Sequence, residues 1–552
     1  MAGWLNPKLP PYDALEWEKL PLGERLRLVC TCWASDGYGA PLAIYGAYLL
    51  KIALYVGGWA LFCGWTPGLG GLADIGAWWL HPIAFQKAIL WSMLFEVLGL
   101  GCGSGPLTGR CVPPIGGFLY FLRPGTTKLP LWPGLPLLGG DRRGPLDVAL
   151  YAAFVAVLVL ALVSAAPPAS LMIAALGLLA AMTIGDRTLF LAARGEHYAT
   201  TILCFLLAGN WIAGAMAVQL ALWFWAGVSK INHHFAAVVG VMSSNSPVVR
   251  LGWWRRRMYR SFPDDLRPSR LATTMAHFGT LLELGVPIAF LLADGPVGLK
   301  VAIALMLGLH AFITSNVPMG VPLEWNVMVV YGGFALFWAH PDVHLADLGS
   351  PPLAAILVVA LVVVPLLGNL FPERISFLPA MRYYAGNWAW SVWLFRGDSY
   401  RKLEAGLTMV SPWVHDQLAY FYDRRTAVGL VGKVQAFRAM HLHGRILGIA
   451  LPRAVERPEE YTYVEGEIVA GLVLGWNFGD GHLHHEPLLA SVQRRCNFAP
   501  GELRCLFVES QPIQTQALSY RIVDAATGEL ARETVTIAAL RRRQPWDVGP
   551  VA

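Results

Sequence analysis

The chain has 552 residues, of which 55% are hydrophobic and only 14% are charged, and its mean hydropathy is +0.49. Soluble globular proteins carry nearer a quarter charged residues, so this composition, with 22 tryptophans, 57 glycines and 38 prolines, is typical of a multi-span membrane protein. It excludes a disordered chain, a collagen, a disulfide scaffold and a DNA-binding domain, so no nucleic-acid partner is expected.

Residues 1–40 are polar and mixed in charge, and they are expected to form an N-terminal cytoplasmic segment without a cleavable signal peptide. A membrane span then needs about 20 mostly apolar residues. The predicted helices are 41–63, 85–102, 147–166, 168–186, 196–208, 211–231, 271–293, 299–316, 324–339 and 352–370. Gly209-Asn210 predicts a turn within 196–231, whereas one long tilted helix there would give nine helices instead of ten.

The positions of lysine and arginine predict the orientation of these ten helices. The loops 64–84, 167, 209–210, 294–298 and 340–351 contain no lysine or arginine, while nineteen of these residues lie on the opposite side. Because positively charged loops stay inside, both chain termini are expected to be cytoplasmic in a multi-pass plasma-membrane protein. A single helix over 196–231 would place Lys230 and the arginines that follow it on the wrong side.

The sequence changes character after residue 370. Residues 371–450 are aromatic and basic, and amphipathic stretches such as 413–445 suggest helices that lie along the bilayer surface. Residues 451–552 are predicted to form a small soluble α+β or β-rich domain. Its expected strands are Tyr461–Val464, Ile468–Leu474, Cys505–Val508, Leu518–Val523 and Thr534–Ile537.

Ionisable residues within apolar segments cost about 2.5–3.5 kcal/mol each on insertion scales, so each needs a physical reason. The conspicuous ones are His197, Lys230, His277, Glu283, His310 and Glu324. Buried pairs or interfacial anchors explain any one of them as well as function does, but as a group they indicate a polar cavity near the cytoplasmic side. A lysine removed from water there is a candidate general base.

Five segments in order resemble the vitamin K-dependent gamma-carboxylases and their bacterial transmembrane relatives. The run Leu220–Asn232 (LALWFWAGVSKIN) resembles their aromatic-x-Ala-Gly-x-x-Lys-Leu segment. The runs that begin at His277 (HFGTLLEL) and His310 (HAFITSNVPMG, followed by Trp325-Asn326) are similar to the next two helices. Glu196-His197-Tyr198 and the aromatic stretch 383–390 complete the series, and the whole chain resembles a family of uncharacterised actinobacterial multi-pass proteins.

This resemblance implies a carboxylase-like membrane enzyme that acts on a lipophilic or quinone-linked substrate. In the carboxylases the lysine deprotonates the hydroquinone cofactor, so Lys230 is implied as the general base, with His197 and His310 beside it. His277 and Glu283 are expected to border the cavity and bind the substrate or a lipid. The alternative is a non-catalytic membrane protein of cell-envelope lipid or lipoglycan assembly that binds lipid headgroups.

A basic and aromatic segment, 247–270, lies between Lys230 and His277. It includes Trp253, Trp254, Arg255, Arg256 and Arg257. We expect it to lie on the membrane surface, to contact anionic lipid headgroups and to roof the cavity, although its arginines would serve equally to set topology during insertion.

Two further motifs suggest ligands. Residues 480–486 hold three histidines and two carboxylates, and His482, His484, His485 and Glu486 are candidate ligands for a divalent metal ion, or else solvated loop residues. The glycine-rich run 99–105 resembles a phosphate-binding loop, but a membrane helix precedes it instead of a strand, which favours a flexible helix exit.

Overall fold

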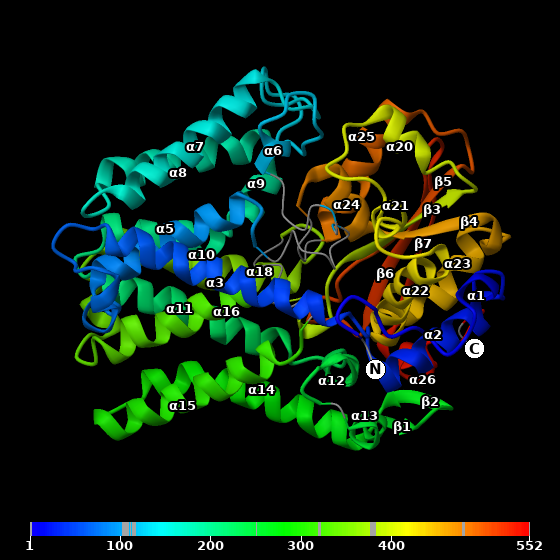
Figure 1. Ribbon diagram of the computed structural model, residues 1–552, viewed down its shortest axis with the longest axis horizontal. Coiled ribbons are helices and arrows are strands. Elements are labelled where there is room, and N and C mark those ends of the chain that lie inside the picture. Colours follow the sequence, from blue (N-terminus) through cyan, green and yellow to red (C-terminus); the bar gives the residue numbers. More distant parts are fainter. Residues whose placement is uncertain are drawn as a thin grey trace.

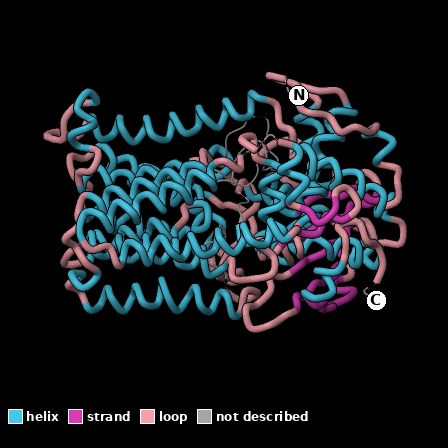
Figure 2. Tube along the Cα trace, turned by 90° about the horizontal axis from the view of Figure 1, so that it is seen from below, coloured by secondary structure: helices cyan, strands magenta, loops and turns pink. Residues whose placement is uncertain are grey.

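The computed structural model describes residues 3–101, 110, 112, 118–249, 251–317, 322–375, 382, 384–476 and 481–550. It consists of a bundle of long apolar helices that runs into a smaller part made of helices and a sheet (Figure 1). Both termini lie with the sheet, at the same end of the molecule (Figure 2).

The bundle contains helix at each of the ten segments expected to be helical. Its helices are α3 (Leu42–Gly64), α5 (Pro82–Val97), α7 (Pro145–Val163), α8 (Ala169–Gly185), α10 (Gly195–Leu207), α11 (Trp211–Ser229), α14 (Arg270–Leu291), α15 (Gly295–Thr314), α16 (Leu323–Gly332), α17 (Pro351–Val358) and α18 (Val364–Leu370). Among the described residues, six helices are long and apolar enough to cross a membrane, and α17 and α18 count as one of them. The molecule has more helices than predicted, because short ones occupy the loops and the sheet-containing part.

Two helices, not one, occupy residues 196–231. The side chain of Asn210 accepts a hydrogen bond from the backbone N–H of Ile212 at 3.1 Å and so caps the start of α11. The N–H of Gly209 donates to the carbonyl of Leu348 at 2.9 Å, and a Cβ on Gly209 would lie 3.3 Å from Gly349. The turn is thus fixed by a cap and by close contact with the loop before α17, and the single-helix alternative is wrong.

The loops without lysine or arginine lie together at one end of the bundle, on the left in Figure 1. Two lysines lie one to two turns inside helices at that end. Lys300 is exposed on α15, and the buried Lys87 of α5 donates to the carbonyl of Phe62 at 3.2 Å and to the hydroxyl of Thr66. The basic loops lie at the other end, with the sheet, so the bundle has one strongly basic end.

The sheet has five antiparallel strands in the order β4-β3-β5-β6-β7. The strands are β3 (Trp390–Arg396), β4 (Tyr461–Glu465), β5 (Leu503–Val508), β6 (Ala517–Asp524) and β7 (Gly528–Thr536). A small α+β unit is therefore confirmed, with two corrections. Residues 468–474, expected as a strand, belong to helix α24 (Gly466–Leu474), because a short buried apolar run suits either structure. Strand β3 was not predicted.

Residues 371–450, expected as helices on the bilayer surface, pack within this unit instead. Strand β3 is in the sheet, and α22 (Arg424–Met440) packs along α2 (Leu22–Asp36) of the N-terminal segment. The ammonium of Lys433 donates at 2.7 Å to the carbonyls of Lys8 and Tyr38. The N-terminal segment and residues 371–450 thus pack together with the sheet. The sequence did not predict this, because aromatic residues suit a buried core as well as a membrane interface.

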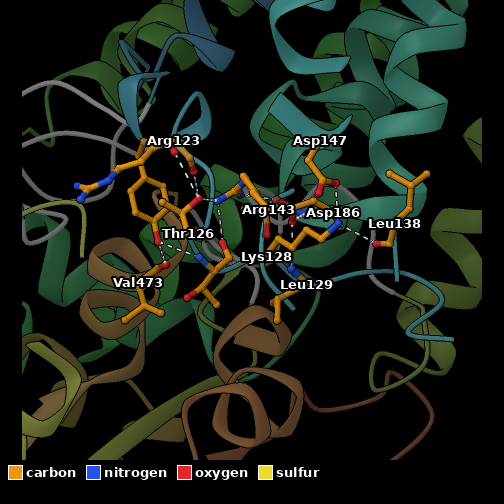
Figure 3. A network of polar contacts seen from close by, with 12 residues as sticks. Arg123, Thr126, Lys128, Leu129, Leu138, Arg143, Asp147, Asp186 and Val473 are labelled. Carbon is orange, nitrogen blue, oxygen red and sulfur yellow. Dashed lines mark hydrogen bonds and ion pairs between the residues drawn. The ribbon is translucent and has the colours of Figure 1, made fainter. Parts of the chain in front are cut away.

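Buried ion pairs fix the basic end of the bundle (Figure 3). Lys128 pairs with Asp147 of α7 at 2.6 Å, and Arg143 pairs with Asp186 at the end of α8. The guanidinium of Arg143 also donates to the carbonyl of Thr127 at 2.7 Å. All four charged side chains are buried, so the loop before α7 is held to two bundle helices by charge.

Two buried histidines pack beside the start of strand β3. His441 and His443 directly follow α22, and their ring centres lie 5.1 and 4.3 Å from that of Trp388. Burial lowers the pKa of His441 to about 3, and burial together with the Arg438 charge lowers the pKa of His443 well below its usual value. Both rings are therefore neutral in the folded protein at neutral pH.

These depressed pKa values predict a loss of stability in acid. Below about pH 6.5 the unfolded chain binds protons at these histidines and the folded chain does not, so each is expected to lower the free energy of unfolding by about 2 kcal/mol at about pH 5. His443→Phe keeps a ring and removes one such group, so it should recover about that amount in acid. Thermal unfolding in detergent at neutral and acid pH measures this, with the exposed His344→Gln as control. An unchanged acid sensitivity in His443→Phe would contradict the prediction.

Candidate functional site

A cavity lies among α11, α12 (Phe235–Asn245), α14, α15 and α16, with Tyr384 as a further wall. About 1000 Å³ of space lies between its side chains, with open solvent at the mouth included. Most of its wall is apolar, and Lys230 and Glu283 are the charged residues among the described side chains that line it. A largely apolar space with a few polar groups is the usual form of a small-molecule site.

Lys230 and Glu283 form an ion pair in this cavity, and both side chains are buried. Lys230 is the C-cap of α11, where its ammonium also donates to the carbonyl of Ala226 at 3.3 Å and lies 5.6 Å above the ring of Phe235. Glu283 comes from α14. A Cβ on Gly227 would lie 2.7 Å from the side chain of Leu284, so this glycine lets the two helices approach closely.

His310 of α15 also lines the cavity, with both ring nitrogens engaged. The indole N–H of Trp223 donates to its Nε2 at 3.0 Å. Its Nδ1 lies 2.7 Å from Oδ1 of Asn326, whose amide N–H₂ donates to the carbonyl of Pro322 at 3.1 Å. Nε2 therefore accepts and Nδ1 donates, which is the neutral imidazole. In this arrangement His310 orients Trp223 and Asn326 and has no nitrogen free to take a proton.

His197 does not line the cavity. It lies behind Trp325, which does, and its Nδ1 accepts the indole N–H of Trp325 at 3.0 Å. The guanidinium of Arg194 lies 5.4 Å from the same indole ring and pairs with Glu96 at 2.7 Å. His197 thus positions a wall of the cavity, whereas the sequence predicted a place beside Lys230.

His277 lies away from the cavity, exposed on α14. It precedes Glu283 by six residues, and since a helix turns about 100° per residue the two side chains point in different directions. His277 is therefore not among the residues that line the described cavity, and its expected contact with substrate or lipid stays a prediction.

The basic and aromatic segment does not roof the cavity. It forms a short helix, α13 (Gly252–Arg257), and a hairpin of β1 (Tyr259–Ser261) and β2 (Asp265–Pro268), in place of one continuous surface helix. Its described residues are absent from the cavity wall, which α12 covers instead.

The arginines of this segment have different environments. Arg255 donates to the backbone carbonyls of Val249, Ser35 and Ser246 at 2.7, 3.1 and 2.9 Å, so it ties α2 to the end of α12. Arg256 and Arg257 are exposed, and each lies 5.0 Å from an aromatic ring, that of Phe262 or Trp253. Trp253 is 54% exposed, and Trp254 packs against the buried core of the sheet-containing part. A lipid contact therefore remains open to Arg256, Arg257 and Trp253.

The fold does not bring together the four residues that the sequence suggested as metal ligands. His482 and His485 converge on Glu509, which follows β5 and had not been predicted. The side chain of His484 turns to the hydroxyl of Ser391 at 2.6 Å.

Glu486, the fourth expected metal ligand, pairs instead with Arg521. Asp480 and most of the glycine-rich run 99–105 lie outside the described residues. Sequence reasoning missed three of these residues. Trp223 and Tyr384 lie within segments that resemble the carboxylases but were not predicted as site residues, and no sequence pattern pointed to Glu509.

No curated protein and no solved structure matches the chain. A family model described as a transmembrane protein of unknown function (DUF3556) matches residues 2–552, so the chain belongs to this family of transmembrane proteins.

Proposed function

We propose that this protein is a membrane enzyme that binds a lipophilic substrate in the cavity and transfers a proton at the Lys230–Glu283 ion pair. The observation that carries the proposal is the pair itself, buried in the wall of an otherwise largely apolar space. Such a space accommodates the apolar body of a lipid-like molecule, and the pair meets its polar end.

The ion pair determines which group takes the proton first. In the pair Lys230 is an ammonium without a free electron pair, whereas the carboxylate of Glu283 accepts a proton. Glu283 then removes the proton from a weakly acidic hydroxyl, the O–H electrons remain on the substrate, and Lys230 stabilises the oxyanion that results. Lys230 becomes the base that the resemblance implies only after it has passed its own proton to Glu283.

A reduced quinone is the substrate class that we favour. It combines a flat apolar ring with weakly acidic hydroxyl groups, and the aromatic side chains of Trp223, Phe235 and Trp325 line the cavity. The resemblance to the gamma-carboxylases points to the same class and rests on the sequence motifs. Carboxylation of protein is not part of the proposal.

The alternative is a non-catalytic protein of cell-envelope lipid or lipoglycan assembly that binds lipid headgroups. The exposed Arg256 and Arg257 favour it, because each basic residue near an anionic surface contributes about 1 kcal/mol to binding. Under this alternative the cavity pair has no role in a reaction.

Substitutions at the ion pair separate the two functions. Lys230→Met removes the positive charge that stabilises the oxyanion, and Glu283→Gln removes the proton acceptor. We expect either change to lower the rate of oxygen-dependent oxidation of a reduced naphthoquinone, measured on protein in lipid nanodiscs, by about 100-fold or more. Arg256→Gln, away from the cavity, serves as the control and should keep the rate. Wild-type protein without activity, or Glu283→Gln with full activity, would contradict the enzymatic proposal.

Membrane-surface binding tests the arginine segment. Replacing Arg256 and Arg257 together with Gln should weaken binding of purified protein to anionic liposomes and leave its unfolding temperature unchanged, because both are exposed. Arg255→Gln should lower the unfolding temperature and leave liposome binding unchanged. It removes three charge-assisted hydrogen bonds of about 1.5–3 kcal/mol each. If all three arginines affect lipid binding equally, the division between them is wrong.

We further propose that the basic end of the bundle, with both termini, faces the cytoplasm. Reporters fused after Gly209 and after Ala552 test this. The first should be active only outside the cytoplasm and the second only inside, because the loop at Gly209 lies at the end without basic loops. A C-terminal reporter active only outside would reverse the orientation.

A further inference from the structure

We propose that His482, His485 and Glu509 form a binding site for a divalent transition-metal ion. The site is separate from the cavity and does not depend on the proposed reaction. His482 lies in the 3-10 turn Gly481–His484, His485 immediately precedes helix α25 (Glu486–Cys496), and Glu509 directly follows β5. The loop before α25 thus meets the end of a central strand of the sheet.

The donor atoms have the spacing that a metal ion needs. One nitrogen from each histidine and one carboxylate oxygen lie within 4.8 Å of one another. Nε2 of His482 is 2.9 Å from one oxygen of Glu509, and Nδ1 of His485 is 3.5 Å from the other. Ligands at about 2.1 Å from a tetrahedral ion lie about 3.4 Å apart, so small side-chain shifts bring all three into range.

The hydrogen bonding of His485 points to a cation at this position. Its Nε2 lies 3.2 Å from the carbonyl of Trp390, which only accepts, so Nε2 carries the proton. In the neutral ring Nδ1 then has a lone pair that faces the carboxylate of Glu509, and Nδ1 is buried without a hydrogen-bond partner. Two electron-rich atoms face each other, and a bound cation between them satisfies both. Metal-binding histidines commonly donate their other N–H to a backbone carbonyl in this way.

The surroundings limit the class of ion. His485 is 2% exposed and Glu509 7%, whereas His482 is only partly buried, so the site is enclosed with one accessible ligand. Arg521 approaches Glu509 at 3.4 Å, but it also pairs with Glu486, which offsets its charge. Two imidazoles and one carboxylate suit zinc, iron(II) or manganese better than magnesium or calcium, and three protein ligands leave a position for water.

Zinc binding to the purified full-length protein tests the site. The protein carries a purification tag without histidine, is treated with chelator, and is titrated with Zn²⁺ against a chromophoric competitor. We expect one equivalent of zinc in the wild type and in the control His344→Gln, which removes an exposed histidine that is not part of the site. Glu509→Gln and His482→Gln should lose this equivalent. Zinc should raise the unfolding temperature of the wild type and leave that of the two ligand variants unchanged.

Controls keep the result interpretable. His482 is only partly buried, so His482→Gln is the variant expected to fold like the wild type, and circular dichroism and elution volume check this. If the wild type binds no zinc, the cluster is a hydrogen-bonded histidine–carboxylate group and the proposal is overturned. Loss of zinc in His344→Gln but not in Glu509→Gln would overturn the ligand assignment.

Discussion

The energetic cost of a charge in an apolar helix bundle determines how the basic end of this molecule is assembled. Removing one partner from a buried ion pair costs about 3–5 kcal/mol, so every such charge needs a partner in place. Four buried pairs meet this need at or near the basic end of the bundle: Lys128–Asp147, Arg143–Asp186, Arg194–Glu96 and Lys230–Glu283. Each joins segments that are separate in the sequence, so together they hold these segments against one another.

These pairs differ in what surrounds them. The carboxylates of Asp147 and Asp186 also accept backbone N–H groups at helix starts, at Gly144 and Thr188, so those pairs double as caps. Lys230 and Glu283 instead form part of a cavity wall. A purely structural pair gains nothing from such a space, because an open cavity forfeits packing. The pair beside the cavity is therefore the one to which we assign chemistry.

The sequence predicts those parts of the fold that depend on local properties. Segment length and hydropathy are local, and so is the capping side chain of Asn210 that divides residues 196–231. The identity of β3 depends on its neighbours, because its tryptophans and phenylalanine suit a membrane interface as well as a central strand. Residues 468–474 form a helix for the same kind of reason, since a short apolar run is decided by what packs against it.

Prediction of the candidate site from sequence is limited in the same way, because the contacts between its side chains depend on the fold. Sequence reasoning selected Lys230, Glu283 and His310 by the cost of burying polar groups, and the fold brings all three to one cavity. It did not predict which side chains form ion pairs or hydrogen bonds with one another, because the partners come from different helices. His310 illustrates the consequence, since Trp223 and Asn326 engage both of its nitrogens. A histidine expected to act beside Lys230 thus holds the wall, and in the proposed reaction the carboxylate of Glu283 takes the proton with Lys230 beside it.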